Sequence, residues 1–188
     1  IGYQLKLAQR EHVLDQGLDV VTWTYDPLES RNARLNLHKL GAVCQTYVAD
    51  YYGPMTDALN RGLPSDRMQV AWWIASEHVR RRLSGEGGGD AATALAQANR
   101  AGRSSAGLLT PGPLILKPGI ESVLYEVPAD FQRIKALDPG LALEWRQATR
   151  EAFEAYFAAG YVASDFRNSV TGGERRNAYV LRVCPELG

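Results

Sequence analysis

Hydrophobic and polar positions in the first fifty residues follow a pattern that predicts helix, strand, helix, strand. Residues 3–16 place their apolar and small side chains at helical spacing, and a glycine follows them. Residues 18–25 are β-branched and aromatic without clean alternation, which predicts a strand buried on both faces in the middle of a sheet. Ser30 is the expected N-cap of a helix over residues 31–40, and residues 42–48 predict another strand. This order is typical of a layered α/β sheet.

The rest of the chain predicts a second structured block behind a linker. The expected elements are a strand at 68–74, a basic helix through 78–82, a strand at 122–127, a short helix at 129–137, a long helix at 139–159, and two strands at 161–167 and 178–183. Asp138 and Pro139 suit the start of the long helix, and Gly172-Gly173 suits a hairpin turn between the last two strands.

Residues 84–107 are rich in Gly, Ala and Ser, which predicts a mobile linker or a surface insertion. We therefore expect a first domain over residues 1–83, a linker or insertion over 84–118, and a C-terminal subdomain over 119–188 that packs on the first.

The composition argues against several classes of function. The 188 residues suit one domain, or one domain with an extension, and 21 basic residues balance 21 acidic ones, so no global field favours nucleic acid or a membrane surface. No apolar run approaches the roughly 20 residues that span a bilayer, and no signal peptide is recognisable. Cys44 and Cys184 are far apart, and with only three scattered histidines we expect no metal site but two buried, reduced thiols, as in the cytoplasm.

Two stretches resemble motifs of the GNAT superfamily of acyl-CoA N-acyltransferases. Ile1-Gly2-Tyr3-Gln4-Leu5 resembles the end of the family's pyrophosphate loop, with Gly2 as its last glycine. The stretch from Ser30 to Ala42 resembles a later motif, with Ala33, Lys39, Leu40 and Gly41 in matching positions. Other segments look like a little-characterised bacterial branch of predicted acetyltransferases, and they extend the resemblance over most of the chain: WTYDPLESRNA, NLHKLGA, YYGPMTDALNRGLPSDR, DFQRIKA and GYVASDF.

The resemblance implies a GNAT-like fold, a mixed central sheet with helices on both faces. The strands and helices that precede the pyrophosphate loop in the family are missing from the sequence, which opens with Ile, so we expect a fragment or a processed chain. Residues 122–183 predict a strand-helix-helix-strand-strand block, which is also the order expected of the missing half. One hypothesis is that this block replaces that half, in a swapped homodimer.

The activity that the resemblance implies is direct transfer of an acyl group from acetyl-CoA or another acyl-CoA, such as succinyl-CoA, to a primary amine such as an amino acid. Ile1, Gly2, Tyr3 and Gln4 would lie around the diphosphate, where the amide groups of a helix start favour anions. Asn32 and Asn36 lie one helical turn apart and would contact coenzyme A. A local capping bond is the alternative for Asn32, and simple exposure is the alternative for Asn36.

The candidate catalytic residues are Asp26, Tyr25 and His38. In many family members a tyrosine protonates the departing thiolate, but Leu37 stands at that position here. His38 and the Tyr25 hydroxyl are candidate replacements, as is Tyr47, and the alternative for His38 is a structural role. Asp26 follows the first strand and could bind or deprotonate the amine, or it could merely start a turn.

Arginines offer further candidate contacts. Arg67 could receive a substrate carboxylate, or it could form a surface salt bridge. Residues 80–82 could reach the 3′-phosphate of coenzyme A, although such a run is usually a solvated helix face. Glu144, Arg146 and Arg150 are typical of a helix surface or of structural ion pairs.

Two other function classes compete with acyl transfer. The first is a catalytically inactive GNAT-like module that binds coenzyme A or a protein partner, and Leu37 together with the missing first half favours it. The second is a nucleotide-binding α/β protein, which lacks support because no complete glycine fingerprint follows a strand.

Overall fold

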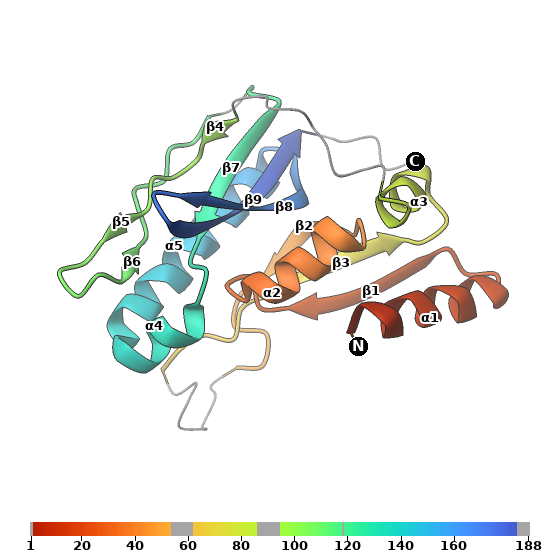
Figure 1. The fold of residues 1–188 in the computed structure, drawn as a ribbon, viewed down its shortest axis with the longest axis horizontal. Helices are drawn as coiled ribbons and strands as arrows, with labels where there is room; N and C mark the ends of the chain where they lie inside the picture. Colours follow the sequence, from red (N-terminus) through yellow and green to blue (C-terminus); the bar gives the residue numbers. More distant parts are fainter. Residues whose placement is uncertain (1, 54–61, 86–94, 118, 184–188) are drawn as a thin grey trace.

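A seven-stranded mixed sheet organises the protein (Figure 1). The computed structural model describes residues 2–53, 62–85, 95–117 and 119–183, and every statement below concerns these residues. Neighbouring strands are antiparallel, apart from the parallel pair of β4 and β7. In order across the sheet, the strands are β1 (Val20–Tyr25), β3 (Arg67–Trp73), β2 (Val43–Val48), β8 (Tyr161–Thr171), β9 (Glu174–Val183), β7 (Ser122–Val127) and β4 (Ala96–Gln97).

Helices cover both faces of this sheet. In Figure 1, α2 lies in front of the sheet and α5 behind it. The chain is thus of the mixed α/β class that the sequence predicts. The helices are α1 (Gly2–Asp15), α2 (Ser30–Ala33), which continues directly into a π-helical segment η1 (Arg34–Lys39), α3 (Glu77–Leu83), α4 (Phe131–Leu137) and α5 (Pro139–Ala158). None of them combines the length and apolar character needed to cross a membrane.

The two halves of the chain share this one sheet. Strands β1, β3 and β2 come from the first half, the others come from the second, and the halves meet where Cys44 pairs with Ala163. One hydrophobic core spans both halves, with Trp72 from β3 and Phe153 from α5. Strand β7 lies in the same sheet as β1, with four strands between them. The C-terminal block therefore extends the sheet of the first half, while the swapped homodimer stays a prediction.

Strand β1 lies at the edge of the sheet, so the expectation of a central strand buried on both faces is wrong. It pairs with β3 alone, because β3 inserts between β1 and β2. Its apolar side chains are covered in another way. The ring of Trp23 packs edge-on against Trp72, with centroids 6.0 Å apart, and the ammonium group of Lys6 lies 3.4 Å from its centroid. Helix α1 thus covers Trp23, although the composition of this strand alone predicts a position in the interior of the sheet.

The helix that begins at Ser30 differs from expectation at its start. Glu29 takes the N-cap position, and the Ser30 hydroxyl donates a 2.7 Å hydrogen bond to the Pro128 carbonyl, so the prediction of a Ser30 cap is wrong. The serine instead ties this helix to the C-terminal block. Along η1 the helix widens, and the Leu40 amide bonds to the carbonyl of Leu35. Such wide turns occur frequently at functional sites.

Other local predictions are confirmed. The Asp138 carboxylate accepts the Leu141 amide at 2.9 Å, and Pro139 occupies the first turn of α5. Strands β8 and β9 form the expected hairpin around Gly172 and Gly173, both at positive φ, and the strands are longer than the sequence predicts.

Part of the predicted linker or insertion, residues 95–117, contains short strands and contacts the main sheet and α5. They include β4, which joins the main sheet, and a small second sheet of β5 (Gly102–Arg103) and β6 (Leu109–Thr110). Ala98 and Leu108 are buried, and the Asn99 side chain exchanges hydrogen bonds of 2.9 and 2.7 Å with the backbone of Glu126. These contacts show that part of the segment is packed, while the proposed division into domains stays a prediction. The remainder of the predicted linker, 86–94 and residue 118, lies outside the described residues.

Gly112 supports a first prediction. A β-carbon at this position would overlap the backbone carbonyl of Arg100, which cannot move without displacing this packed segment. We expect Gly112→Ala to lower the free energy of unfolding by about 1–3 kcal/mol. Gly2→Ala is the control, because its β-carbon would meet only the Leu35 side chain at 3.8 Å. Urea unfolding of both variants checks this, and equal midpoints would contradict the close approach.

Candidate functional site

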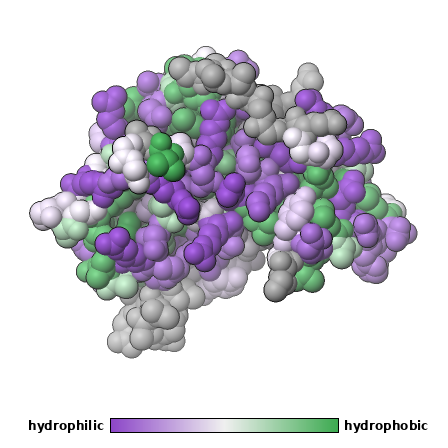
Figure 2. All heavy atoms as spheres, viewed as in Figure 1, coloured by the Kyte–Doolittle hydropathy of each residue, from purple (hydrophilic) through white to green (hydrophobic). Residues whose placement is uncertain are grey.

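A polar groove opens on the face of the sheet that carries η1. Its main cavity has a volume of about 750 Å³ and lies between η1 and strands β4, β7, β8 and β9. A second cavity of about 610 Å³ lies beside α2 and the start of α4. The two share Arg34, Asn168 and Asn177, and we call them together the arginine groove. Figure 2 shows hydrophilic residues gathered across the middle of this face.

His38 and Asp165 form a pair in the main cavity. His38 Nδ1 lies 3.0 Å from Asp165 Oδ1, and the two side chains are 32% and 14% exposed. Within the described part of the chain, His38 Nε2 makes no hydrogen bond. In the neutral tautomer that carries its proton on Nδ1 and donates it to this carboxylate, Nε2 can accept a proton. This is the arrangement of an oriented general base.

Asp165 is itself held in place. It accepts the Phe166 amide at 2.7 Å, and an Arg82 guanidinium nitrogen lies 3.3 Å from its Oδ1. The register of β8 shifts between Ala163 and Asp165, and such irregularities often direct a side chain toward a site. The geometry of His38 is therefore set by residues from the other half of the chain.

Arginines without acidic partners line the groove. Arg34, Arg100 and Arg167 line the main cavity, and Arg31 and Arg175 line the smaller one; among the described residues none of their guanidinium groups forms an ion pair. The acidic groups of the main cavity are already engaged. Asp165 pairs with His38, and Glu126 accepts a 2.8 Å hydrogen bond from Arg176. The groove is consequently positive and suits an anionic ligand.

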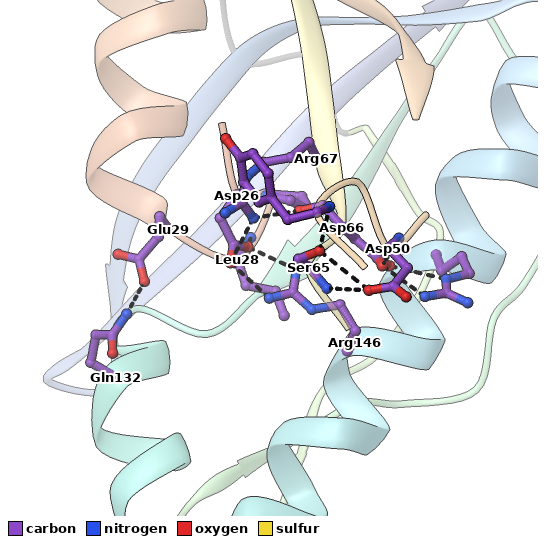
Figure 3. A network of polar contacts seen from close by, with 12 residues as sticks. Asp26, Leu28, Glu29, Asp50, Ser65, Asp66, Arg67, Gln132 and Arg146 are labelled. Carbon is purple, nitrogen blue, oxygen red and sulfur yellow. Dashed lines mark hydrogen bonds and ion pairs between the residues drawn. The ribbon is translucent and has the colours of Figure 1, made fainter. Parts of the chain in front are cut away.

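A second polar cluster lies where β1, the β2–β3 connection and α5 meet (Figure 3). Arg146 donates to both carboxylate oxygens of Asp26, at 2.8 and 2.7 Å, and is only 1% exposed. Arg67 approaches the same carboxylate at 3.7 Å. Arg150 donates to both oxygens of the buried Asp66, at 3.0 and 2.7 Å. The carboxylates of this ion-pair network already have arginine partners, so their charges are balanced without a ligand.

The structure brings two predicted site residues, Asp26 and Arg67, into this network. Asp26 also accepts the Leu28 amide at 2.9 Å, as expected of a residue that starts a turn. Arg67 donates to the Asp66 carbonyl at 2.8 Å and lies over the Tyr52 ring. Arg67 forms a salt bridge, as its alternative role predicts, but the bridge is to Asp26 at 3.7 Å and is mostly buried, while the Asp66 carboxylate pairs with Arg150. Asp26 and Arg67 line neither cavity of the groove.

Asp66 supports a prediction on pH. Burial alone would raise the pKa of Asp66, but hydrogen bonds from Arg150, the Asp50 amide and Tyr47 together hold it below its usual value. A carboxyl group with a depressed folded pKa stabilises the protein above its unfolded pKa of about 4, and that stability is lost as the pH falls through the folded pKa.

We therefore expect thermal stability to fall as the pH is lowered below about 4, and the fall to be shallower in Asp66→Asn. Asp15→Asn, at an exposed carboxylate of α1, is the control and should keep the wild-type dependence. Calorimetric melting from neutral to acidic pH checks this. An unchanged slope in Asp66→Asn would contradict the assigned role.

Tyr25, the other candidate at the end of β1, lies in the core. It is 5% exposed, and its hydroxyl donates to that of Tyr179 at 3.3 Å, which in turn donates to the Pro27 carbonyl at 2.6 Å. Burial, reinforced by the nearby Cys44, raises the pKa of Tyr25 well above its ordinary value. Tyr25 lines neither cavity, so its placement gives no support to a catalytic role.

The two motif stretches meet, but outside the groove. Gly2 lies beside Leu35, so the first turn of α1 approaches η1. Gly2, Tyr3 and Gln4 are in this turn and line neither cavity, and Ile1 lies outside the described residues. Their assignment to coenzyme A stays a prediction.

The helix candidates also line neither cavity. Asn32 is exposed, whereas Asn36 is 3% exposed, so the alternative of simple exposure for Asn36 is wrong. Arg80 and Arg81 are on a solvated helix face as expected, but Arg82 is mostly buried beside Asp165. Arg146 belongs to the ion-pair network and not to the helix surface, unlike the exposed Glu144.

Other groove residues carry no role in the sequence prediction. Asp165 and Arg167 are two positions apart in a predicted strand, so they are expected on the same face of it. This spacing is a signal in the sequence that could have placed them in one site. Arg34 offers no such signal beyond its charge. Cys44 is buried and unpaired, and burial raises its pKa to about 12, whereas Cys184 lies outside the described residues.

Comparison with known proteins identifies no relative. No protein-family model matches the chain, and neither does any curated protein or solved structure. In the described ranges, no group of three His, Cys, Asp or Glu side chains is placed to hold a metal ion. The candidate site therefore rests on its own geometry.

Proposed function

We propose that this protein is an acyl-CoA-dependent N-acyltransferase that transfers an acetyl or succinyl group directly to a primary amine, such as that of an amino acid. The observation that carries the proposal is the pair of His38 and Asp165, 3.0 Å apart, in a groove with unpaired arginines. The pair offers a base for the amine, and the arginines offer partners for the phosphates of coenzyme A. The resemblance to GNAT motifs supports this reaction, and we propose that it takes place in the cytoplasm.

The reaction needs only proton transfer and positioning. One proton of the acceptor ammonium passes to His38 Nε2 and later to solvent, while Asp165 stabilises the imidazolium. The neutral amine then attacks the thioester carbonyl. A C–N bond forms, the C–S bond breaks, and the second proton lost from nitrogen ends on the CoA thiol. Holding both substrates in one groove supplies much of the rate gain.

The test is turnover with a matched control. Acetyl-CoA and succinyl-CoA are each incubated with a panel of amino acids and other primary amines, and CoA release and N-acylated products are measured. We expect amine-dependent release that matches the product by mass. Product at the level of a protein-free control with every pair would refute the proposal.

A second candidate, a coenzyme A-binding module without catalysis, is favoured by Leu37. This residue stands where the family has its acidic tyrosine, and it is fully buried. Calorimetry separates the candidates, because binding of coenzyme A without any turnover would establish the module and exclude the enzyme.

A further inference from the structure

The structure points to a ligand class for the arginine groove: a small molecule with two phosphate-bearing positions held apart, one in each cavity. Arg100 and Arg167 serve the main cavity, Arg31 and Arg175 serve the smaller one, and Arg34 lies on both. This inference deepens the proposed function. If that function holds, the ligand is acyl-CoA, which carries a 3′-phosphate apart from its diphosphate.

The charge of the groove favours an anionic ligand. The two acidic groups that face the main cavity, Glu126 and Asp165, are already paired with Arg176 and His38. In the smaller cavity, Glu29 accepts the Gln132 amide, and Asp130 caps α4 by accepting the Arg133 amide at 3.0 Å. In each cavity the lining arginines outnumber the lining carboxylates, so both cavities keep a net positive charge.

The kind of cation indicates phosphate. The basic residues that line the two cavities are all arginines, apart from His38. A planar guanidinium donates two parallel hydrogen bonds to one phosphate, which a lysine ammonium cannot do. Five such groups over two cavities exceed what one carboxylate needs, and they match an anion with several charges.

Besides Arg34, the residues that the two cavities share are the uncharged Asn168 and Asn177. Where the cavities join, the Asn168 amide donates to the Asn177 side chain at 2.5 Å, and Asn177 is nearly buried. Amides at this point suit a spacer that carries hydroxyl groups, such as a ribose. Both cavities fall within the roughly 300–1,000 Å³ range of small-molecule sites.

The experiment uses adenosine 3′,5′-bisphosphate, which has two separated phosphates and no thioester. Its binding to the full chain is measured by calorimetry for wild type, Arg34→Gln, Arg167→Gln and the control Arg81→Gln, an exposed arginine on α3. We expect each groove variant to bind about 10- to 100-fold more weakly, and Arg81→Gln to bind like wild type. Wild-type binding should also weaken as salt is added. Circular dichroism and melting of each variant establish that it is folded.

Further probes decide the ligand class. Inorganic phosphate should compete weakly, because it fills one cavity at a time. Succinate binding more tightly than the bisphosphate would overturn the inference in favour of a dicarboxylate. Absence of bisphosphate binding, or wild-type affinity in both groove variants, would also overturn it. Binding without acyl transfer would refute the proposed function alone, whereas acyl transfer that both groove variants retain at wild-type KM would refute only the phosphate site.

Discussion

Replacing His38 with alanine is expected to lower kcat for acyl transfer by about 10²- to 10⁴-fold, the contribution of a positioned general base. Among the described residues, His38 is the only histidine that lines the main cavity, and Asp165 orients its ring. The substitution therefore removes the group that would accept the proton. Coenzyme A binding should change little, because the phosphates contact arginines and not His38. Steady-state kinetics of the purified variant, with its own melting curve, measure both effects.

His12→Ala is the matched control for this substitution. His12 is exposed on α1, bonds only to Gln16 among the described residues, and lines neither cavity, so we expect wild-type kinetics. Added imidazole should restore part of the activity of His38→Ala, since it can enter the vacated space and act as the base. A folded His38→Ala variant with wild-type kcat would refute the catalytic role of this residue.

Replacing Arg146 with methionine is expected to destabilise the protein by about 3–5 kcal/mol, the largest effect on stability that the structure predicts. Arg146 is almost completely buried, and both of its terminal nitrogens bond to Asp26. Burial disfavours its charge, but the hydrogen bonds that it donates to Asp26 raise the pKa of Arg146 above its usual value. Without the guanidinium, Asp26 remains as a mostly enclosed carboxylate whose main partner is gone. Urea unfolding gives the change.

Two further variants test the cause of that loss. Arg80→Met makes the same change in an exposed pair with Glu77, 3.8 Å apart, and should cost between 0 and about 1 kcal/mol. Asp26→Asn combined with Arg146→Met removes both charges, and the amide oxygen can still accept the Leu28 amide. The double variant should therefore recover a substantial part of the stability. Equal stability of the double variant and Arg146→Met would mean that lost packing, and not an unpaired charge, is the cause.

The same network explains how the two halves of the chain are held together. Asp26 follows β1 and Asp66 precedes β3, whereas Arg146 and Arg150 lie one turn apart on α5. The two ion pairs therefore fasten both loops of the first half to the long helix of the second. The arginine groove opens between the same halves, so an Arg146 variant that remains folded should also bind the bisphosphate more weakly.

Local signals in the sequence were sufficient for most helices and strands. Asp138-Pro139 marked the start of α5, and Gly172-Gly173 marked the β8–β9 turn, because caps and glycine turns depend on backbone preferences within a few residues. The mixed α/β class followed from the same elements. His38 was a candidate from its position beside Leu37, but its pairing with Asp165 was not visible.

Positions in the sheet and the partners of charged residues depended on the tertiary structure. The apolar content of β1 predicted a central strand, but β3 separates it from β2, because the packing of the whole chain decides which strands pair. His38 and Asp165 are 127 residues apart, and Asp26 and Arg146 are 120 apart. Backbone preferences within a few residues cannot specify a contact between residues so far apart in the sequence. The sequence by itself therefore determined the elements and the residue types available for chemistry, and only the packing of the two halves decided which of them form the groove and which form the ion-pair network.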